Sequence, residues 1–401
     1  MILKFPKNIS DKINFLIGSK NFISKNFETF NNLSIEFLSD VSQEIFKDKS
    51  LLIYPDIISF AFWSRKKALE AEKQVLKINN CFGRGLTFHI APSNVALNFI
   101  YSFSFSLLAG NSNIVRLPSK RFKEIDLIFK IFKKLKIKKY KKIFESNIFI
   151  RYEANDLVNS YFSSISNTRM IWGGDNTINK FRKYPTNPFC VDFTFPDRYS
   201  LCIINSLALK KLNDFNYNNL VKNFFNDTYL YDQMACNSPH LIIWQNPDDK
   251  QIDRFWLKIK EYLKKKYTLD HFMAVNKLTK LQTEKVENKN KNINEIKNFK
   301  NILILIDLNK IEKNFTDKKG QYGYFYQVKN ISLKKFFLKS NPKIQTITYF
   351  GLDKNEINQQ IKECLPSGID RVVPIGQSSR IKFVWDGFNM INNLSRKIEI
   401  Y

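Results

Sequence analysis

The stretch Leu86-Thr87-Phe88-His89-Ile90-Ala91-Pro92-Ser93-Asn94 decides the fold of this 401-residue chain. Its first six residues predict a buried strand, and Pro92-Ser93-Asn94 predicts a turn whose Ser or Asn can cap a following helix. That helix is expected from about Ala96 to Leu108, because Ala109-Gly110-Asn111 is a typical C-terminal stop. The pattern is a strand, a turn and a helix, which is the repeating unit of a parallel sheet.

The same alternation continues downstream. Further strands are predicted at 113–117, 148–152 and 170–172, with a helix over 121–135 between the first two. A strand–helix–strand succession implies a parallel sheet with right-handed crossovers. Since ligands of such sheets bind beyond the carboxyl ends of the strands, the turns that follow these strands are the expected binding sites.

The chain is long enough for two or three domains. Residues 1–80 are expected to form an N-terminal helical layer, because from about residue 8 apolar side chains recur at three-to-four spacing. The parallel-sheet unit is assigned to 81–199, a second α/β unit to 200–370, and a C-terminal segment that returns to the body of the protein to 371–401. The Lys/Asn/Glu-rich residues 284–300 predict a solvated helix or loop.

Cys236 lies between an amphipathic helical stretch and the strand-like run Leu241–Trp244, among small and polar residues. Without further context such a Cys is more often a packed core residue than a nucleophile, so both interpretations are kept. The five Cys are widely spaced without a CxxC pair, which predicts reduced thiols in a cytoplasmic protein and no zinc-type metal site. The other four are interpreted as structural: Cys81, Cys190, Cys202 and Cys364.

The formal net charge is +27, from 64 Lys and Arg against 37 Asp and Glu. The cations are scattered, with no Arg-aromatic stripe and no nucleic-acid motif, so we expect weak polyanion binding but no specific nucleic-acid partner. The most apolar stretch, Val95 to Ala109, is interrupted by Asn98 and three serines, and is too short and polar to span a bilayer. The N-terminus lacks the apolar core of a signal peptide, so a cytoplasmic protein that is not integral to the membrane is expected.

Several sequence blocks occur in one order along the chain. They are Gly83-Arg84-Gly85, His89 to Val95, Leu107 to Arg116, Pro118-Ser119-Lys120, Trp172-Gly173-Gly174-Asp175, the Cys236 segment and Gly368 to Gln377. In this order they resemble the acyl-CoA reductase family, whose best-known member is the fatty-acyl reductase of bacterial luminescence. The resemblance spans roughly residues 80–390. It implies an α/β fold of the aldehyde-dehydrogenase type, with a parallel-sheet NADP-binding domain over 81–199 and an α/β catalytic domain with Cys236 over 200–370.

The resemblance implies NADPH-dependent reduction of a fatty-acyl thioester to the aldehyde. The implied partner is acyl-CoA, or an acyl-carrier or acyl-transferase protein, and the family often has an oligomerisation element, so a homo-oligomer is compatible with it. Two alternatives remain open at this point. One is an NAD(P)-dependent aldehyde dehydrogenase, which a Glu in the general-base position would favour. The other is a catalytically inactive scaffold of the same fold that binds polyanions, which an inert Cys236 would favour.

Three residues match catalytic positions of the family. Cys236 matches the cysteine that attacks the thioester carbonyl and holds the acyl group. Asn94 matches an amide that donates to the developing oxyanion, for which the backbone N–H of Cys236 is a second candidate; the alternative is a helix cap. Asp192 falls near the general-base Glu of aldehyde oxidisers, and a surface Asp is the alternative. His240, four residues after Cys236, could lower the pKa of the thiol or merely cap a strand.

The cofactor residues implied by the resemblance lie in the turns after the strands. Ser119 and Lys120 match the turn that holds the adenosine ribose, and a cation there suits the 2′-phosphate of NADPH. The run Arg116-Leu117-Pro118 has one residue more than the usual arrangement, so Arg116 competes for that position. The glycines allow close backbone approach to the pyrophosphate. The complete expected set is Pro92, Arg116, Ser119, Lys120, Gly173 and Gly174.

Overall fold

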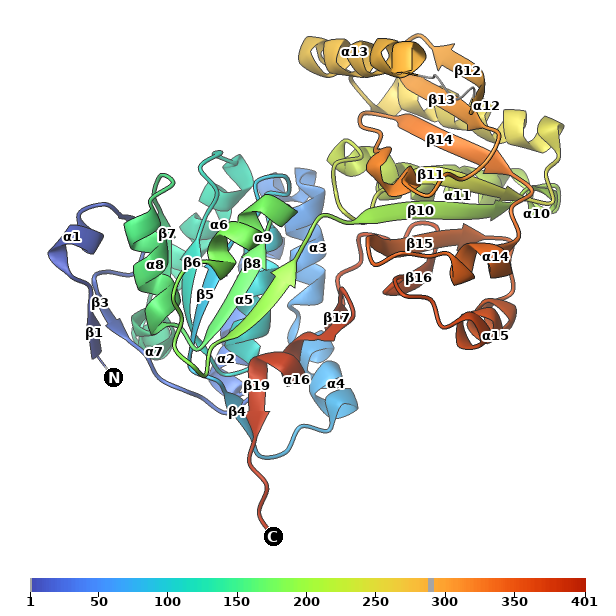
Figure 1. Ribbon diagram of the computed structural model, residues 1–401. Coiled ribbons are helices and arrows are strands. Elements are labelled where there is room, and N and C mark those ends of the chain that lie inside the picture. Colours follow the sequence, from blue (N-terminus) through green and yellow to red (C-terminus); the bar gives the residue numbers. More distant parts are fainter. Residues whose placement is uncertain (1, 288–291) are drawn as a thin grey trace. The chain divides into compact units, whose positions relative to one another are not determined.

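The computed structural model describes residues 2–287 and 292–401. The chain divides into two compact units (Figure 1). Unit 1 contains the chain up to Asp197 together with Ile381–Tyr401, and unit 2 is Arg198–Arg380. The chain therefore passes between the units twice, once before the first strand of unit 2 and once after its last.

Unit 1 is built on a six-stranded sheet in the order β2-β7-β6-β5-β8-β9. The five strands from β5 to β9 are parallel, and β2 pairs antiparallel with β7 at the edge. The strands are β2 (Asn14–Ile17), β5 (Leu86–Ile90), β6 (Ser112–Arg116), β7 (Asn147–Arg151), β8 (Thr168–Trp172) and β9 (Val191–Phe195). The predicted parallel sheet is thus confirmed. β5, β6, β7 and β8 lie where strands were predicted, whereas the two edge strands, β2 and β9, were not predicted.

Two apolar cores lie on the two faces of this sheet, because neighbouring strand residues point to opposite sides. Val115 and Phe149 belong to one core, and Ile114 and Ile148 to the other. The first core contains side chains of α2 (Asn32–Lys47), α3 (Pro55–Trp63), α5 (Asn98–Leu108) and α6 (Lys123–Lys134). The second contains side chains of α1 (Lys7–Ser10), α8 (Asp156–Ile165) and α9 (Asp175–Arg182).

The expectation of an all-helical region from about residue 8 is wrong for its first part. β2 and β3 (Asn21–Ile23) lie there, and β3 pairs with β1 (Ile2–Lys4). These strands are only three or four residues long, and β2 is stabilised by β7, which is more than a hundred residues away in sequence. Local periodicity therefore cannot identify them. From α2 through α4 (Lys66–Leu76) the helical prediction is confirmed.

The C-terminal residues complete unit 1. β19 (Ser395–Lys397) pairs antiparallel with β4 (Cys81–Gly83), and α16 (Met390–Leu394) packs on α5. Phe383 and Trp385 are buried in the same core as α5. The hairpin strands β17 (Val384–Trp385) and β18 (Phe388–Asn389) precede α16 in the chain. Residues nearly 300 positions apart in sequence thus share one core.

Unit 2 is built on a seven-stranded sheet in the order β12-β13-β14-β11-β10-β15-β16. All neighbouring pairs are parallel except β12 with β13. The strands are β10 (Tyr199–Asn205), β11 (Pro239–Gln245), β12 (Ile293–Phe299), β13 (Leu303–Leu308), β14 (Tyr324–Lys329), β15 (Ile344–Phe350) and β16 (Arg371–Pro374). Helices cover both faces, so the α/β prediction is confirmed here too.

The helices of unit 2 divide between the two faces of the sheet. α11 (Asp214–Thr228) and α12 (Asp249–Lys266) contribute to one core, and α13 (His271–Glu287), α14 (Leu333–Leu338) and α15 (Lys354–Cys364) to the other. The short α10 (Ser206–Leu209) follows β10.

The prediction of a solvated helix or loop over 284–300 is wrong at 293–299, which form β12, while 288–291 lie outside the described residues. β12 is an edge strand with one partner and one exposed side, so it needs few apolar residues.

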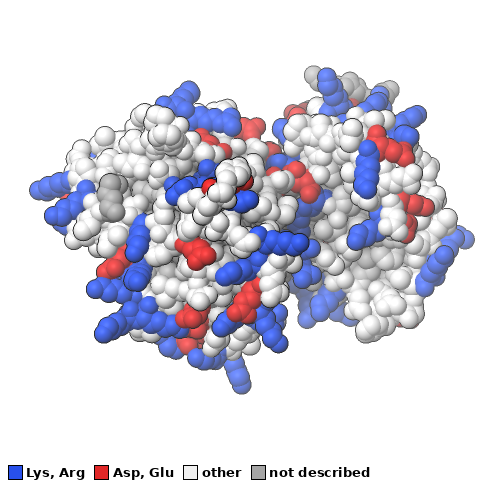
Figure 2. Space-filling view, turned by 90° about the horizontal axis from the view of Figure 1, so that it is seen from below, with Lys and Arg blue, Asp and Glu red and all other residues white. Residues whose placement is uncertain are grey.

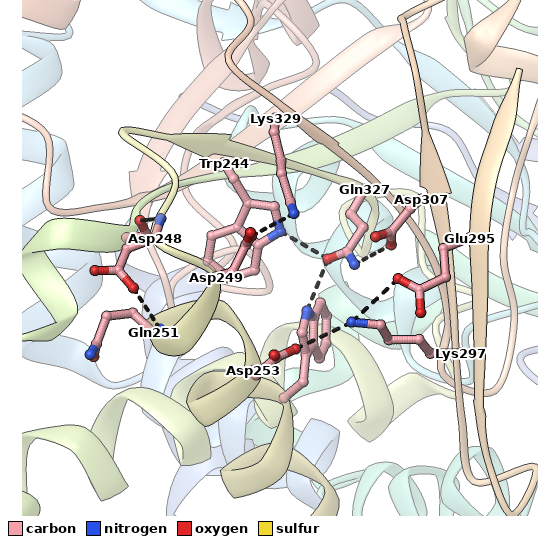
Figure 3. Close-up of polar contacts among 12 residues, drawn as sticks. Trp244, Asp248, Asp249, Gln251, Asp253, Glu295, Lys297, Asp307, Gln327 and Lys329 are labelled. Atoms are coloured by element: carbon pink, nitrogen blue, oxygen red, sulfur yellow. Dashed lines mark hydrogen bonds and ion pairs between the residues drawn. The ribbon is translucent and has the colours of Figure 1, made fainter.

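A buried polar network fixes the carboxyl ends of the central strands of unit 2 (Figure 3). The indole N–H groups of Trp244 and Trp256 donate to Gln327 Oε1 at 2.8 and 2.9 Å, and Gln327 Nε2 donates to Asp307. Every polar atom of the Gln327 amide group is therefore engaged, as burial of an amide requires.

Basic side chains are spread over the face seen in Figure 2 and are interspersed with carboxylates. No helix in the described part of the chain has the length and the apolar run that crossing a bilayer needs.

A second polar network joins α5 to the sheet of unit 1. Trp172 Nε1 donates to Ser102 Oγ at 3.0 Å, and His89 lies 2.8 Å from Ser102 Oγ through Nδ1 and 2.9 Å from Asn113 Oδ1 through Nε2. Because the amide oxygen can only accept, the Nε2 of His89 carries the proton and Nδ1 accepts from the serine. Burial lowers the pKa of His89 to about 4.

This network predicts a loss of stability in acid. The pKa of His89 is about 4 in the folded protein and about 6.5 in the unfolded chain. Between these values the unfolded chain binds more protons. The contribution of His89 to the free energy of unfolding is therefore fully present above pH 6.5 and is lost as the pH falls toward 4. The contribution is roughly 2–3 kcal/mol between pH 7 and pH 4.5. Urea unfolding at these two pH values should show a smaller decrease for His89→Gln than for the native protein. The exposed His271→Gln variant is the control and should show the native decrease; an equal decrease in His89→Gln would refute the assignment.

Candidate active site

Cys236 lies in a tight turn at the amino end of β11. α11 leads into a short 3-10 helix, Tyr229–Tyr231, after which Asp232 and Gln233 adopt left-handed backbone conformations with φ of 54° and 60°. These two residues reverse the chain, and β11 begins at Pro239. The predicted helix-to-strand junction is thus confirmed, and it places Cys236 beside the central strands of unit 2.

Gln233 anchors the turn to a neighbouring strand. Its Oε1 accepts from the backbone N–H groups of Gly323 and Tyr324 at 3.1 and 3.0 Å. Its Nε2 donates to the carbonyls of Pro239 and Tyr324 at 2.9 and 3.0 Å. A fully buried amide with both its oxygen and its nitrogen engaged gives the turn one defined conformation.

Cys236 itself is held at two points. Ser200 Oγ donates to the carbonyl oxygen of Cys236 at 2.7 Å, and Gln345 Nε2 donates to its Sγ at 3.4 Å. Ser200 and Gln345 lie near the amino ends of β10 and β15, the two strands that follow β11 in the order of the sheet. The thiol is half-buried, in contrast to the buried Cys202 and Cys364. Cys236 is therefore not sealed in the core, and its sulfur and carbonyl have polar partners in fixed positions.

The buried carboxylate of Asp227 connects the segment after β16 to the Cys236 turn. Asp227, at the end of α11, accepts from the backbone N–H groups of Gly376 and Ser378 at 2.6 and 3.0 Å and from Ser378 Oγ at 2.9 Å. Asn237 Nδ2, next to Cys236, donates to the same Ser378 Oγ at 3.2 Å. Burial raises the pKa of Asp227 to about 6, against the effect of these donors. The Cys236 turn and the segment after β16 are thereby fixed to one another.

The remaining thiols and His240 differ from Cys236 in their environment. Burial raises the pKa of Cys190 to about 11 and that of Cys202 further still, which disfavours their thiolates. His240 is buried in β11, where desolvation and the charge of Lys319 lower its pKa to about 3. It is therefore neutral near pH 7 and supplies no positive charge to lower the pKa of Cys236. These surroundings support a structural role for His240 and not a role in lowering the pKa of Cys236.

The expected cofactor turns follow three adjacent strands of unit 1. Pro92 and Asn94 follow β5, Ser119 and Lys120 follow β6, and the Gly173-Gly174 pair follows β8. Since β5 lies between β6 and β8, these turns share one edge, at the point where the order of the strands reverses. This is the place where parallel sheets bind ligands.

The helix-cap alternative for Asn94 is wrong. The N-cap of α5 is Leu97, and it makes no side-chain cap bond. The chain makes a further turn over residues 95–97 before the helix begins, so Asn94 lies outside the capping position, and its side chain is exposed. The exposed amide lies in the same turn as Pro92, at the carboxyl end of β5.

Lys120 and Arg116 have different surroundings. The Lys120 ammonium lies 4.9 Å from the centre of the Phe122 ring, in an exposed turn. The Arg116 guanidinium lies 4.5 Å from the centre of the Tyr152 ring, and is half-buried. Arg151 Nε donates to the carbonyl of Pro118 at 3.1 Å and so fixes the start of the Lys120 turn.

The second glycine of the Gly173-Gly174 pair has open space around it at the start of α9. Gly174 is the N-cap of α9, and a Cβ added to it would meet no atom within 4 Å. A Cβ added to Gly173 would approach the side chain of Thr177 at 3.0 Å. Backbone N–H groups at the start of a helix are suited to binding an anion. The residues of this edge thus fit a nucleotide cofactor.

Asp192 is part of a salt bridge within unit 1. Its two carboxylate oxygens accept from Arg169 Nε and NH2 at 2.7 and 2.6 Å, and Arg169 also donates to the carbonyl of Phe181 at 2.8 Å. The guanidinium is buried, so removing Asp192 would leave an uncompensated buried charge. This pairing supports the interpretation of Asp192 as a structural carboxylate and not that of a catalytic base.

Sequence reasoning missed Ser200, Asp227, Gln345 and Ser378. Gln345 had one visible signal, since it interrupts an otherwise apolar and β-branched run in Ile344–Phe350. The other three are common polar residues in unremarkable surroundings, and only the fold reveals their contacts with the turn.

A family model described as acyl-CoA reductase (LuxC) matches residues 66–397 of the chain. No curated protein sequence matches the chain.

Several solved structures have a similar fold. The lactaldehyde dehydrogenase of Escherichia coli has a TM-score of 0.62 at 13% identity, over 90% of this chain and 85% of that one. The glyceraldehyde-3-phosphate dehydrogenase GapN of Methanocaldococcus jannaschii, complexed with NADP, has a TM-score of 0.58 at 12% identity, over 91% and 88%. A bifunctional proline utilization A protein has a TM-score of 0.60 at 11% identity, and this chain spans only 38% of its length. At such identities the likeness shows the fold, and the predicted aldehyde-dehydrogenase fold is confirmed.

Proposed function

The chain belongs to the acyl-CoA reductase (LuxC) family, and from this premise we propose that it reduces an acyl thioester, acyl-CoA or acyl-protein, to the aldehyde with NADPH. The observation that carries the proposal is the half-buried Cys236, whose sulfur receives an amide N–H in a turn fixed by Ser200 and Gln233. A thiol in a defined, polar and accessible position is what nucleophilic catalysis requires.

In the proposed first step, the thiolate of Cys236 attacks the carbonyl carbon of the thioester. The carbonyl oxygen becomes negatively charged. From the match of the sequence to the family, we assign the side-chain amide of Asn94 and the backbone N–H of Cys236 as its donors. The carbon–sulfur bond to the leaving thiol then breaks, the leaving sulfur takes up a proton, and the acyl group remains on Cys236. NADPH, when bound, would supply a hydride to the carbon of this acyl group. The carbon–sulfur bond to Cys236 then breaks, the aldehyde leaves, and Cys236 returns to the thiolate from which the first step began.

For the cofactor, we assign the edge formed by the turns after β5, β6 and β8. Gly173 and Gly174 allow the phosphates to approach the backbone, and Pro92 and Ser119 belong to the adjoining turns. Lys120 is an exposed cation of this edge, whereas Arg116 is half-buried; each lies over an aromatic ring. We therefore assign the adenosine 2′-phosphate to Lys120 and treat Arg116 as the second candidate.

A general base that activates water would let the acyl-enzyme hydrolyse, so a reductase is served best when the carboxylate expected as that base is already engaged elsewhere. Asp192, the residue expected at that position, is occupied by Arg169. The proposal therefore favours reduction of a thioester over oxidation of an aldehyde to an acid.

The proposed function is tested by supplying the purified protein with acyl-CoA and NADPH and following three products in parallel. Aldehyde, free CoA thiol and oxidised cofactor should appear in equal amounts. Supplying aldehyde with NADP in the absence of CoA should yield little acid. Rapid acid formation, or nucleotide binding without any turnover, would support the dehydrogenase or the inactive scaffold instead.

Lys120→Glu is expected to change the preference between cofactors. A charge-assisted contact with the 2′-phosphate is worth roughly 1.5–3 kcal/mol, which corresponds to about ten- to a hundredfold in preference. The variant loses this attraction and gains a repulsion, while its carboxylate can accept from the free 2′-hydroxyl of NADH. The ratio of kcat/KM for NADPH and NADH measures the effect, and the neighbouring exposed Lys123→Glu is the matched control. If the ratio is unchanged in Lys120→Glu, the assignment moves to Arg116 or Arg121.

A further inference from the structure

The sulfur of Cys236 has a polar partner from a distant strand. The amide Nε2 of Gln345 donates to it at 3.4 Å, although 109 residues separate the two in sequence. The Gln345 side chain is fully buried. A buried amide needs partners for its hydrogen bonds, and here one partner of the Gln345 amide nitrogen is the sulfur of Cys236. A neutral thiol is a weak acceptor and a thiolate a strong one, so this bond gains strength when Cys236 ionises.

Contacts on both sides hold Gln345 in place. Its carbonyl accepts from Asp370 N at 3.0 Å, and the next residue, Thr346, donates its backbone N–H to Ser200 Oγ at 3.2 Å. The hydroxyl of Thr346 donates to Gln345 Oε1 at 3.4 Å. Since the amide oxygen faces this hydroxyl, the amide nitrogen is the end that faces the sulfur.

Ser200 joins these contacts to the turn itself. The hydroxyl that accepts from Thr346 also donates to the carbonyl of Cys236 at 2.7 Å. The amino ends of β10 and β15 and the Cys236 turn thus form one hydrogen-bonded set, and the amide of Gln345 is positioned before any substrate binds. Such preorganised donors are most effective in a site that excludes water.

We propose that Gln345 is a catalytic residue of the Cys236 site, whose amide N–H stabilises the negative charge of the thiolate. This role rests on the proposed function for its use in turnover. In that step, the Cys236 thiol loses its proton and its sulfur bonds to the carbonyl carbon. The bond from that carbon to the leaving sulfur breaks, and the leaving thiolate takes up a proton. The hydrogen bond from Gln345 is strongest while the sulfur is charged and weakens once the sulfur is acylated, because a thioester sulfur is a poor acceptor.

The test replaces the donor without changing the size of the side chain. Gln345→Met removes the N–H, and the rate at which iodoacetamide alkylates Cys236 is followed by peptide mass from pH 5 to pH 10. A hydrogen bond to a charged group corresponds to about ten- to a hundredfold in the thiolate equilibrium. We therefore expect alkylation at pH 7 to slow at least tenfold and the midpoint of the pH profile to move upward.

Gln327→Met is the matched control, because Gln327 is also a buried strand glutamine of the same sheet, near its opposite, carboxyl edge (Figure 3). It should leave the alkylation profile at its native position even if the melting temperature falls. If Gln345→Met does not fold, Gln345→Leu replaces it, since its side chain also lacks the donor and the midpoint should again rise. A native profile in either folded Gln345 variant, or an equal shift in Gln327→Met, overturns the assignment.

Alkylation requires no acyl thioester, so this experiment separates the two proposals. If Gln345→Met shifts the profile but the native protein forms no acyl adduct, the thiolate role holds and the proposed substrate is wrong. If the adduct forms and the profile does not shift, the proposed function holds and Gln345 is a structural residue only.

Discussion

Replacing Cys236 by Ala is expected to abolish thioester reduction, with a loss of at least about a thousandfold in kcat, because no acyl-enzyme can form. The substitution removes the sulfur atom of a half-buried residue, while Gln233 and Ser200 still hold the turn through atoms that do not change. The melting temperature should therefore stay close to the native value. The rate of NADPH oxidation in the presence of acyl-CoA measures the effect.

The matched control for Cys236→Ala is Cys190→Ala, since Cys190 is another partly exposed thiol, and burial raises its pKa to about 11. This control should keep native activity. Loss of activity in the control and its retention in Cys236→Ala would show that the wrong thiol has been assigned.

The second largest effect is expected for Asn94→Ala. If the amide donates to the oxyanion, its removal should lower kcat by roughly a hundredfold, with little change in the dissociation constant of NADPH. A structural role as a helix cap is not available to Asn94, because Leu97 is the N-cap of α5. Steady-state kinetics and fluorescence titration with NADPH separate the two quantities.

The neighbouring Ser93→Ala is the control for Asn94→Ala, because Ser93 is exposed in the same turn. It should change kcat by no more than about twofold. A fall in melting temperature as the main defect of Asn94→Ala, with kcat preserved, would remove Asn94 from the catalytic set.

The parallel sheets could be predicted from the sequence because their signals are local. Each central strand is a short apolar run, and Gly110 with Asn111 ends the helix that follows β5. The edge strands could not be predicted in the same way. β12 can be polar because it is an edge strand with one partner, and β2 has only four residues and pairs with β7, more than a hundred residues away in sequence.

The candidate site likewise combines features with a local sequence signal and contacts between distant residues. The position of Cys236 between a helix and a strand follows from the residues around it. Its contact with Gln345 does not, because the two residues are far apart in the chain and meet only through the order of β10, β11 and β15. The ion pair of Asp192 with Arg169 is likewise a consequence of β8 lying beside β9. Residue type and spacing along the chain carry no information on such pairings.

The central claim is that Cys236 carries the acyl group, and the intact mass of the protein after mixing with acyl-CoA in the absence of NADPH tests it most directly. We expect the mass to increase by one acyl group, with the modified peptide containing Cys236, and to return to the native value when NADPH is added. The Cys236→Ala variant should gain no mass under the same conditions. An unmodified native protein, or an acyl group on another residue that persists in Cys236→Ala, would contradict the claim.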